Sequence, residues 1–146
     1  MSADADDLER AYHRLKAGDD TVVACLGDQM LTSPGRGVAP LVDWLSAGVD
    51  LTGFAVADRV VGRAAALLYS LAGVGAVHAL LASQPGLDVL SRSGIAGRAD
   101  TVVPRILNRD RSAGCPLEAA VAGIDDPGQA LVALRQRLNQ LRAGHD

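Results

Sequence analysis

The chain has 146 residues and a formal charge of −3 at pH 7, and 49% of its residues are hydrophobic but only 3% aromatic. This length and composition predict one domain, residues 1–146, whose core is built from Ala, Val, Leu and Ile side chains. The acidic balance and the few stacking rings argue against nucleic-acid binding, and no apolar run approaches the ~20 residues that cross a membrane.

The first part of the chain predicts a helix, a hairpin and a second helix. Apolar side chains at helical spacing indicate an N-terminal helix within residues 1–18, and Gly18 ends it. Apolar, partly β-branched runs on either side of Gly27 and Asp28 are typical of a hairpin with a two-residue turn. The expected elements are a helix over 4–17, strands over 21–26 and 29–32, a loop over 33–37 and a helix over 38–47.

Strands and helices alternate through the rest of the chain. The expected elements are strands over 53–57, 76–82 and 101–103, and helices over 60–71, 86–93, 117–122 and 128–142. Alternation of this kind predicts a largely parallel sheet that helices cover on both faces, with the hairpin adding antiparallel strands. The predicted fold class is therefore α/β.

The stretch over 104–118 holds the first candidate site. Cys115 precedes Pro116, which suits the first position of a helix, and Glu118, which suits the third. The thiol is therefore expected at a helix N-cap, where the helix dipole and unpaired amides favour the thiolate. In the functional interpretation Cys115 is a nucleophile or an orienting thiol. In the alternative it is an unreactive cap.

Charged residues beside this cysteine suggest that an anion binds there. Five arginines lie between residues 92 and 111, against two aspartates. An arginine-rich patch in an acidic protein suits a small anionic ligand better than a polymer. Asn108 and Arg109 would bind this ligand, and Asp110 would serve as a general base. The alternative is a solvated face whose ion pairs contribute little to stability.

The second candidate site is Asp58, expected where a buried strand ends and a helix begins. Ligands of open α/β sheets bind at such strand ends, and Asp58 would handle protons there. Arg59 and Arg63 are four residues apart, so they would share a helix face and bind the anion, while Gly62 would allow close approach. The alternative is that Asp58 is a plain N-cap and that the small residues serve helix packing.

Arg36, in the loop Pro34–Gly37, is a weaker candidate for anion binding. The loop loosely resembles a phosphate cradle but lacks the Walker spacing. No metal and no cofactor are predicted, because the three histidines are far apart and no zinc-binding motif is present. The chain has no signal-peptide pattern, and we expect a cytoplasmic protein whose two cysteines are free thiols.

Five segments together resemble an uncharacterised prokaryotic family, DUF1893. They are Gly35–Leu41, Val56–Ala66, Ile106–Asp110, Cys115–Glu118 and Ile124–Pro127. The resemblance implies a cytidine-deaminase-like fold, a three-layer α-β-α sandwich with a mixed five-stranded sheet.

The resemblance also bears on the chemistry. Deaminases take zinc ligands from two helix starts, which here would lie near 37–41 and 58–62 and hold no such ligand, so zinc-dependent deamination is not expected. The family typically has lysines at the positions of Arg59 and Arg63. Arginine there favours anion binding over amine catalysis.

These observations predict a metal-independent enzyme, or an enzyme-derived binder, for a small anionic metabolite such as a nucleotide. Its pocket would lie where Asp58 meets the loop over 108–115. The alternative is a non-catalytic regulatory module that self-associates as a homodimer or larger oligomer through the helices over 60–72 and 128–142.

Overall fold

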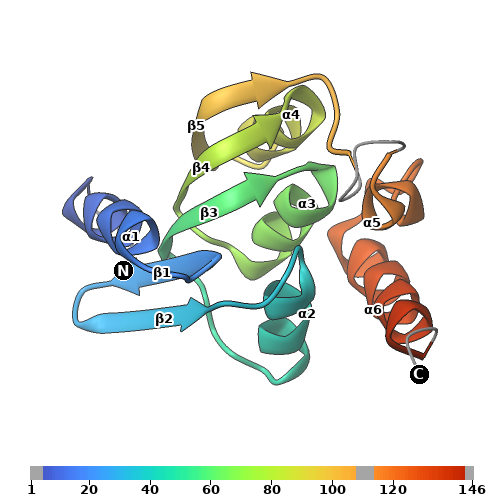
Figure 1. Cartoon of the computed structure of the whole chain (residues 1–146), viewed down its shortest axis with the longest axis horizontal. Helices are drawn as coiled ribbons and strands as arrows, with labels where there is room; N and C mark the ends of the chain where they lie inside the picture. Colours follow the sequence, from blue (N-terminus) through green and yellow to red (C-terminus); the bar gives the residue numbers. More distant parts are fainter. Residues whose placement is uncertain (1–4, 108–113, 144–146) are drawn as a thin grey trace.

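The computed structural model describes residues 5–107 and 114–143, and Figure 1 shows how its elements are arranged. The helices are α1 (Ala5–Ala17), α2 (Ala39–Ser46), α3 (Arg63–Ala72), α4 (Gln84–Arg92), α5 (Pro116–Ala120) and α6 (Pro127–Ala143). The strands are β1 (Val22–Leu26), β2 (Gln29–Ser33), β3 (Ala55–Val61), β4 (Ala76–Ser83) and β5 (Ala96–Val103). This order confirms the predicted α/β class.

The strands of the described residues form one mixed five-stranded sheet in the order β2-β1-β3-β4-β5. β1 runs antiparallel to β2 and β3, whereas β3, β4 and β5 are parallel. The hairpin of β1 and β2 turns at Gly27, whose φ of 59° is the left-handed conformation that a tight two-residue turn requires. The predicted hairpin and the largely parallel remainder of the sheet are both confirmed.

Helices cover the two faces of the sheet unequally. On one face α1 buries Ala11 and Leu15 completely against Val23, Cys25 and Ala57. On the other face lies the main hydrophobic core, to which α2, α3, α4 and α6 contribute, with α6 packed on α3. Each large aliphatic side chain buried in this way contributes about 1.5–3 kcal/mol. The arrangement is consistent with the predicted three-layer sandwich.

The boundary between β3 and α3 lies later in the chain than the sequence predicts. β3 continues to Val61, and α3 begins at Arg63 with Gly62 as its N-cap. The prediction that Asp58 ends the strand and caps the helix is therefore wrong. The physical reason is that Val60 and Val61 are β-branched and continue the parallel pairing with β4.

β5 is also longer than predicted, because most of its residues are small or polar and exposed and give no periodic signal. Gly97 allows Leu90 of α4 to pack against the strand, since a Cβ on Gly97 would lie 2.7 Å from Leu90 Cδ1. Parallel pairing with β4, rather than local propensity, therefore forms most of this strand.

Candidate functional site

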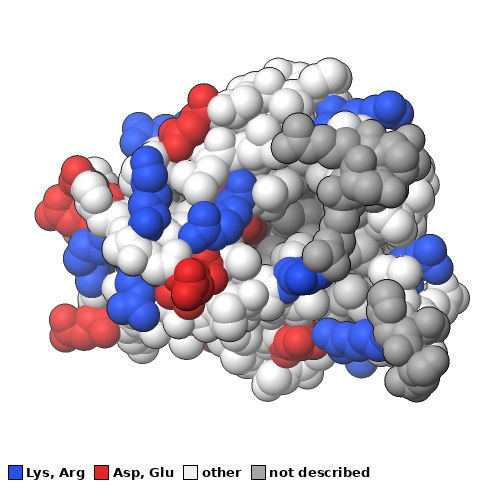
Figure 2. All heavy atoms as spheres, viewed as in Figure 1, with Lys and Arg blue, Asp and Glu red and all other residues white. Residues whose placement is uncertain are grey.

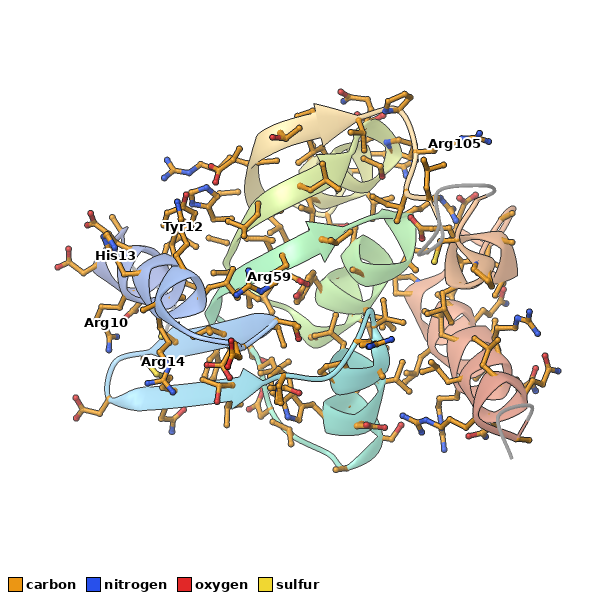
Figure 3. All side chains as sticks on the ribbon, viewed as in Figure 1. Arg10, Tyr12, His13, Arg14, Arg59 and Arg105 are labelled. Carbon is orange, nitrogen blue, oxygen red and sulfur yellow. The ribbon has the colours of Figure 1, made fainter. Side chains whose placement is uncertain are left out.

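A cavity of about 440 Å³ lies at the carboxyl end of β4, between the start of α3 and α5. The side chains that line it include Arg63, Ser83, Arg105, Cys115 and Glu118. In Figure 3, Arg105 lies on the α5 side of the molecule. This edge of an open α/β sheet is where such sheets bind ligands.

Glu118 supplies the N-terminal cap of α3. Its two carboxylate oxygens accept hydrogen bonds from the amides of Arg63 and Ala64, each at 2.7 Å. A carboxylate at this position satisfies unpaired amides and interacts favourably with the helix dipole. Gly62 makes the approach possible, because a Cβ there would lie 1.8 Å from Glu118 Oε1. Sequence reasoning missed Glu118 as a site residue; the available signal was Gly62, an N-cap without a side chain.

Arg63 is bound within the protein rather than free for a ligand. Its guanidinium donates to the carbonyls of Val121 and Ile124, at the end of α5, and to Asp125 Oδ1 at 2.7 Å. The Val121 carbonyl also accepts from the amide of Ile124, so Arg63 reinforces the turn that follows α5. Together with Glu118, Arg63 ties α5 to the start of α3, which is a structural role that the sequence did not reveal.

Arg59 lies in β3 and holds the end of α1. Its Nε donates to the carbonyl of Asp20 at 2.7 Å, and its Nη2 donates to the carbonyls of Leu15 and Gly18 at 3.0 and 2.9 Å. These carbonyls are at or just beyond the C-terminus of α1, where a cation is favourable. The prediction that Arg59 shares a helix face with Arg63 is wrong, because β3 extends through Arg59.

Asp58 is buried in the middle of β3 and faces α3. The hydroxyl of Tyr69 donates to Asp58 Oδ2 at 2.5 Å, and both residues are buried. Burial raises the pKa of Asp58 to about 7, against the opposing effect of hydrogen bonds from Tyr69 and from the amides of Val60 and Arg59. Asp58 does not line the cavity, so the geometry does not support its predicted role in handling protons there.

Cys115 occupies the N-cap of α5, and Pro116 the first helical position, as predicted. The thiol itself makes no capping hydrogen bond. The backbone amide of Cys115 donates to the carbonyl of Ile106 at 3.2 Å, which joins the segment after β5 to α5. The side chain is partly buried and lines the cavity, where a bound molecule would contact it.

The remaining predicted residues are not placed at the cavity. Asn108, Arg109 and Asp110 lie outside the described residues. Arg36 is exposed in the loop before α2 and does not line the cavity. Its neighbour Gly37 lies close to α5, since a Cβ there would be 3.6 Å from Leu117 Cδ1. The structure therefore brings Gly62, Arg63 and Cys115 together, and adds Glu118 and Arg105.

Over residues 5–107 and 114–143, no three His, Cys, Asp or Glu side chains are grouped so that they could hold a metal ion. No helix in the same ranges is both long and apolar enough to cross a bilayer. Figure 2 shows acidic and basic side chains intermixed at the α1 end of the molecule. On this face the described side chains therefore form no continuous basic surface.

Comparison with known proteins identifies the family. A family model described as TM1506, domain of unknown function (DUF1893), matches residues 10–138. The crystal structure of a DUF1893 family protein, TM1506 from Thermotoga maritima, has a TM-score of 0.82 and 26% sequence identity to this chain, covering 96% of this chain and 93% of that one. No match is found among curated proteins. Because the family model matches most of this chain, the chain belongs to the DUF1893 family.

Proposed function

We propose that this chain binds a small metabolite with an anionic group in the cavity between β4, α3 and α5. The observation that carries the proposal is Arg105, which lines the cavity and has no hydrogen-bond or ion-pair partner among the described residues. Its guanidinium offers five N–H donors in a planar fork that matches a carboxylate or phosphate group. The cavity volume of about 440 Å³ lies in the range of small-molecule sites, and a nucleotide is one candidate.

A side chain, rather than a helix N-terminus, would bind this anion. The first amides of α3 already donate to Glu118. The positive end of that helix therefore interacts with an internal carboxylate, and these amides are not available to a ligand. The donors of Arg63 are directed to carbonyls after α5 and to Asp125. Arg105 is thus the cation that the described wall of the cavity leaves available.

Binding, rather than catalysis, is the function that the geometry supports best. Cys115 lines the cavity, yet no base is hydrogen-bonded to its thiol among the described residues. The enzyme hypothesis, with Cys115 as nucleophile, also needs Asp110 as its base, and that residue lies outside the described ranges. We therefore assign Cys115 a contact with the bound molecule.

A cytidine-deaminase-like topology is part of the proposal. Its support is the sheet itself, in which an antiparallel hairpin lies beside three parallel strands in the order β2-β1-β3-β4-β5. Deaminases take their zinc ligands from the starts of two helices. In this proposal the start of α3, which borders the cavity, corresponds to one of these two helix starts.

Replacement of Arg105 by Gln tests the binding proposal. We expect inorganic phosphate and a nucleoside monophosphate to produce saturable NMR shifts at Ser83 and Arg105, and the uncharged nucleoside to produce none. Arg105→Gln should weaken binding by about tenfold, because it removes a charge-assisted bidentate contact. Arg135→Gln, an exposed position on α6, is the matched control. Equal effects of the two variants, or no saturable shift with either anion, would contradict the proposal.

Alkylation of Cys115 gives an independent readout of the same cavity. A bound anion should slow the reaction of Cys115 with iodoacetamide, since the thiol would lie against the ligand. Cys25 is fully buried in β1 and serves as an internal control that stays unmodified in the folded protein. If a ligand changes the NMR signals of Arg105 but leaves the alkylation rate of Cys115 unchanged, Cys115 does not contact the bound molecule.

A further inference from the structure

A second cavity, of about 520 Å³, lies between α1 and the strands β4 and β5. It is lined by Leu8, Glu9, Tyr12 and His13 of α1, by His78 of β4 and by Arg98 of β5. Figure 3 shows Tyr12 and His13 at the opposite side of the molecule from Arg105. This cavity is therefore separate from the one described above.

A network of polar side chains joins three residues that line this second cavity, Tyr12, His78 and Arg98, to Asp100. The carboxylate of Asp100 accepts a hydrogen bond from the hydroxyl of Tyr12 at 2.7 Å, and it lies 2.8 Å from His78 Nε2. The rings of Tyr12 and His78 stack with their centroids 4.0 Å apart and their planes at 9°. Arg98 Nε donates to His78 Nδ1 at 3.4 Å. His78 is buried, whereas Asp100 and Arg98 are exposed, so the network connects the protein interior to the surface.

The network determines which donors remain for a ligand. Because Arg98 Nε donates to Nδ1, the imidazole of His78 carries its proton on Nε2 and donates it to Asp100. Both ring nitrogens of His78 are thereby engaged, and the imidazole positions Arg98. The two terminal Nη groups of Arg98 have no partner among the described residues, and the side chain is exposed. Because the guanidinium is held at Nε, its two Nη groups lose less conformational entropy when they bind a ligand.

We propose that this second cavity binds a small molecule with one carboxylate or phosphate group, which accepts hydrogen bonds from Arg98. Leu8 and Ala5 of α1 supply an apolar wall against which the uncharged part of the molecule packs. The negative charge of Asp100 is already engaged by Tyr12 and His78, so it opposes the anion less than a free carboxylate would. The exposed carboxylate of Glu9 lies 3.9 Å from His13 Nε2, on the outer wall.

The test uses benzoate, inorganic phosphate and uncharged benzamide as probes. Benzoate and phosphate share the oxyanion, benzoate adds an apolar ring, and benzamide keeps the ring without the charge. We expect saturable NMR shifts at Tyr12, His78 and Arg98, stronger with benzoate than with phosphate if the apolar wall contributes, and none with benzamide. Arg98→Gln should weaken binding by about tenfold, and Arg135→Gln should leave it unchanged.

The outcomes separate this site from the proposed function. Shifts confined to Ser83 and Arg105 would support the first cavity and overturn the second. Loss of binding equally in Arg98→Gln and Arg135→Gln would show nonspecific attraction and also overturn it. Arg98→Gln also removes the Nε donor to the buried imidazole of His78, so some loss of stability is expected. Thermal denaturation followed by circular dichroism checks that the variant is folded at the temperature of the binding measurement.

Discussion

At the scale of single residues, Asp58 is a carboxyl group buried inside β3, away from water. Burial in β3 raises its pKa from 3.8 to about 7. Between these values the folded protein retains a proton that the unfolded chain has released. The contribution of Asp58 to stability therefore falls as the pH rises through this window, and it stays low above it.

Replacement of Asp58 by Asn should remove this dependence. The amide is always neutral and imitates the protonated carboxyl. As the pH rises from about 4 to above 7, the free energy of unfolding of the variant should therefore increase relative to that of the wild type, by at most about 4 kcal/mol. Urea unfolding across this range measures the difference in free energy. Asp28→Asn, in the exposed turn of the hairpin, controls for the loss of one negative charge. A constant difference between wild type and Asp58→Asn would show that Asp58 is ionised throughout.

At the scale of elements, the junction of α5 with α3 shows what local sequence reveals and what it does not. Cys115 and Pro116 predict the start of α5 correctly, because capping and proline preferences act within one turn. The partner of Glu118 could not be predicted, since its hydrogen bond to Arg63 spans 55 residues. The sequence showed Arg105 only as one of the five arginines between residues 92 and 111; its place at the cavity, just beyond the end of β5, depends on how distant elements pack.

Glu118→Gln should loosen this junction. The neutral amide retains one acceptor oxygen for two backbone donors and lacks the charge that interacts with the helix dipole. We therefore expect the free energy of unfolding to fall by about 1–2 kcal/mol. Hydrogen exchange of the Arg63 and Ala64 amides should accelerate in the variant. Glu9→Gln, on the exposed face of α1, is the matched control. Unchanged protection of the two amides would mean that the start of α3 does not depend on the Glu118 cap.

At the scale of the whole molecule, local patterns predicted the order of elements and distant contacts determined the rest. The hairpin and the strand–helix alternation follow from turn residues and periodicity along short segments. The extent of β3 and β5 follows from pairing with β4, and the role of Arg59 follows from the docking of α1. Those contacts join parts of the chain that no local pattern connects.

Arg59→Ala should therefore weaken the layer that α1 forms. It removes three hydrogen bonds from a charged donor, and the carbonyls of Leu15, Gly18 and Asp20 lose their partner. We expect the free energy of unfolding, measured with urea, to fall by about 1.5–3 kcal/mol, and hydrogen exchange in α1 to become faster. Arg14, which is 55% exposed and pairs with Asp20 at 3.2 Å, is the control. Arg14→Ala should lower the free energy of unfolding by less than about 1 kcal/mol. Equal losses in the two variants would mean that removing a positive charge, rather than the three hydrogen bonds of Arg59, causes the effect.

The order of the strands has a consequence for synthesis on the ribosome. After the hairpin forms, β3 pairs with β1, β4 with β3, and β5 with β4, so each new strand joins an edge that has already been made. The sheet can grow in the direction of translation, without waiting for a later strand to be inserted between earlier ones. The hydrogen bond from Tyr12 to Asp100 spans 88 residues, so the first helix becomes fully attached only when the last strand arrives.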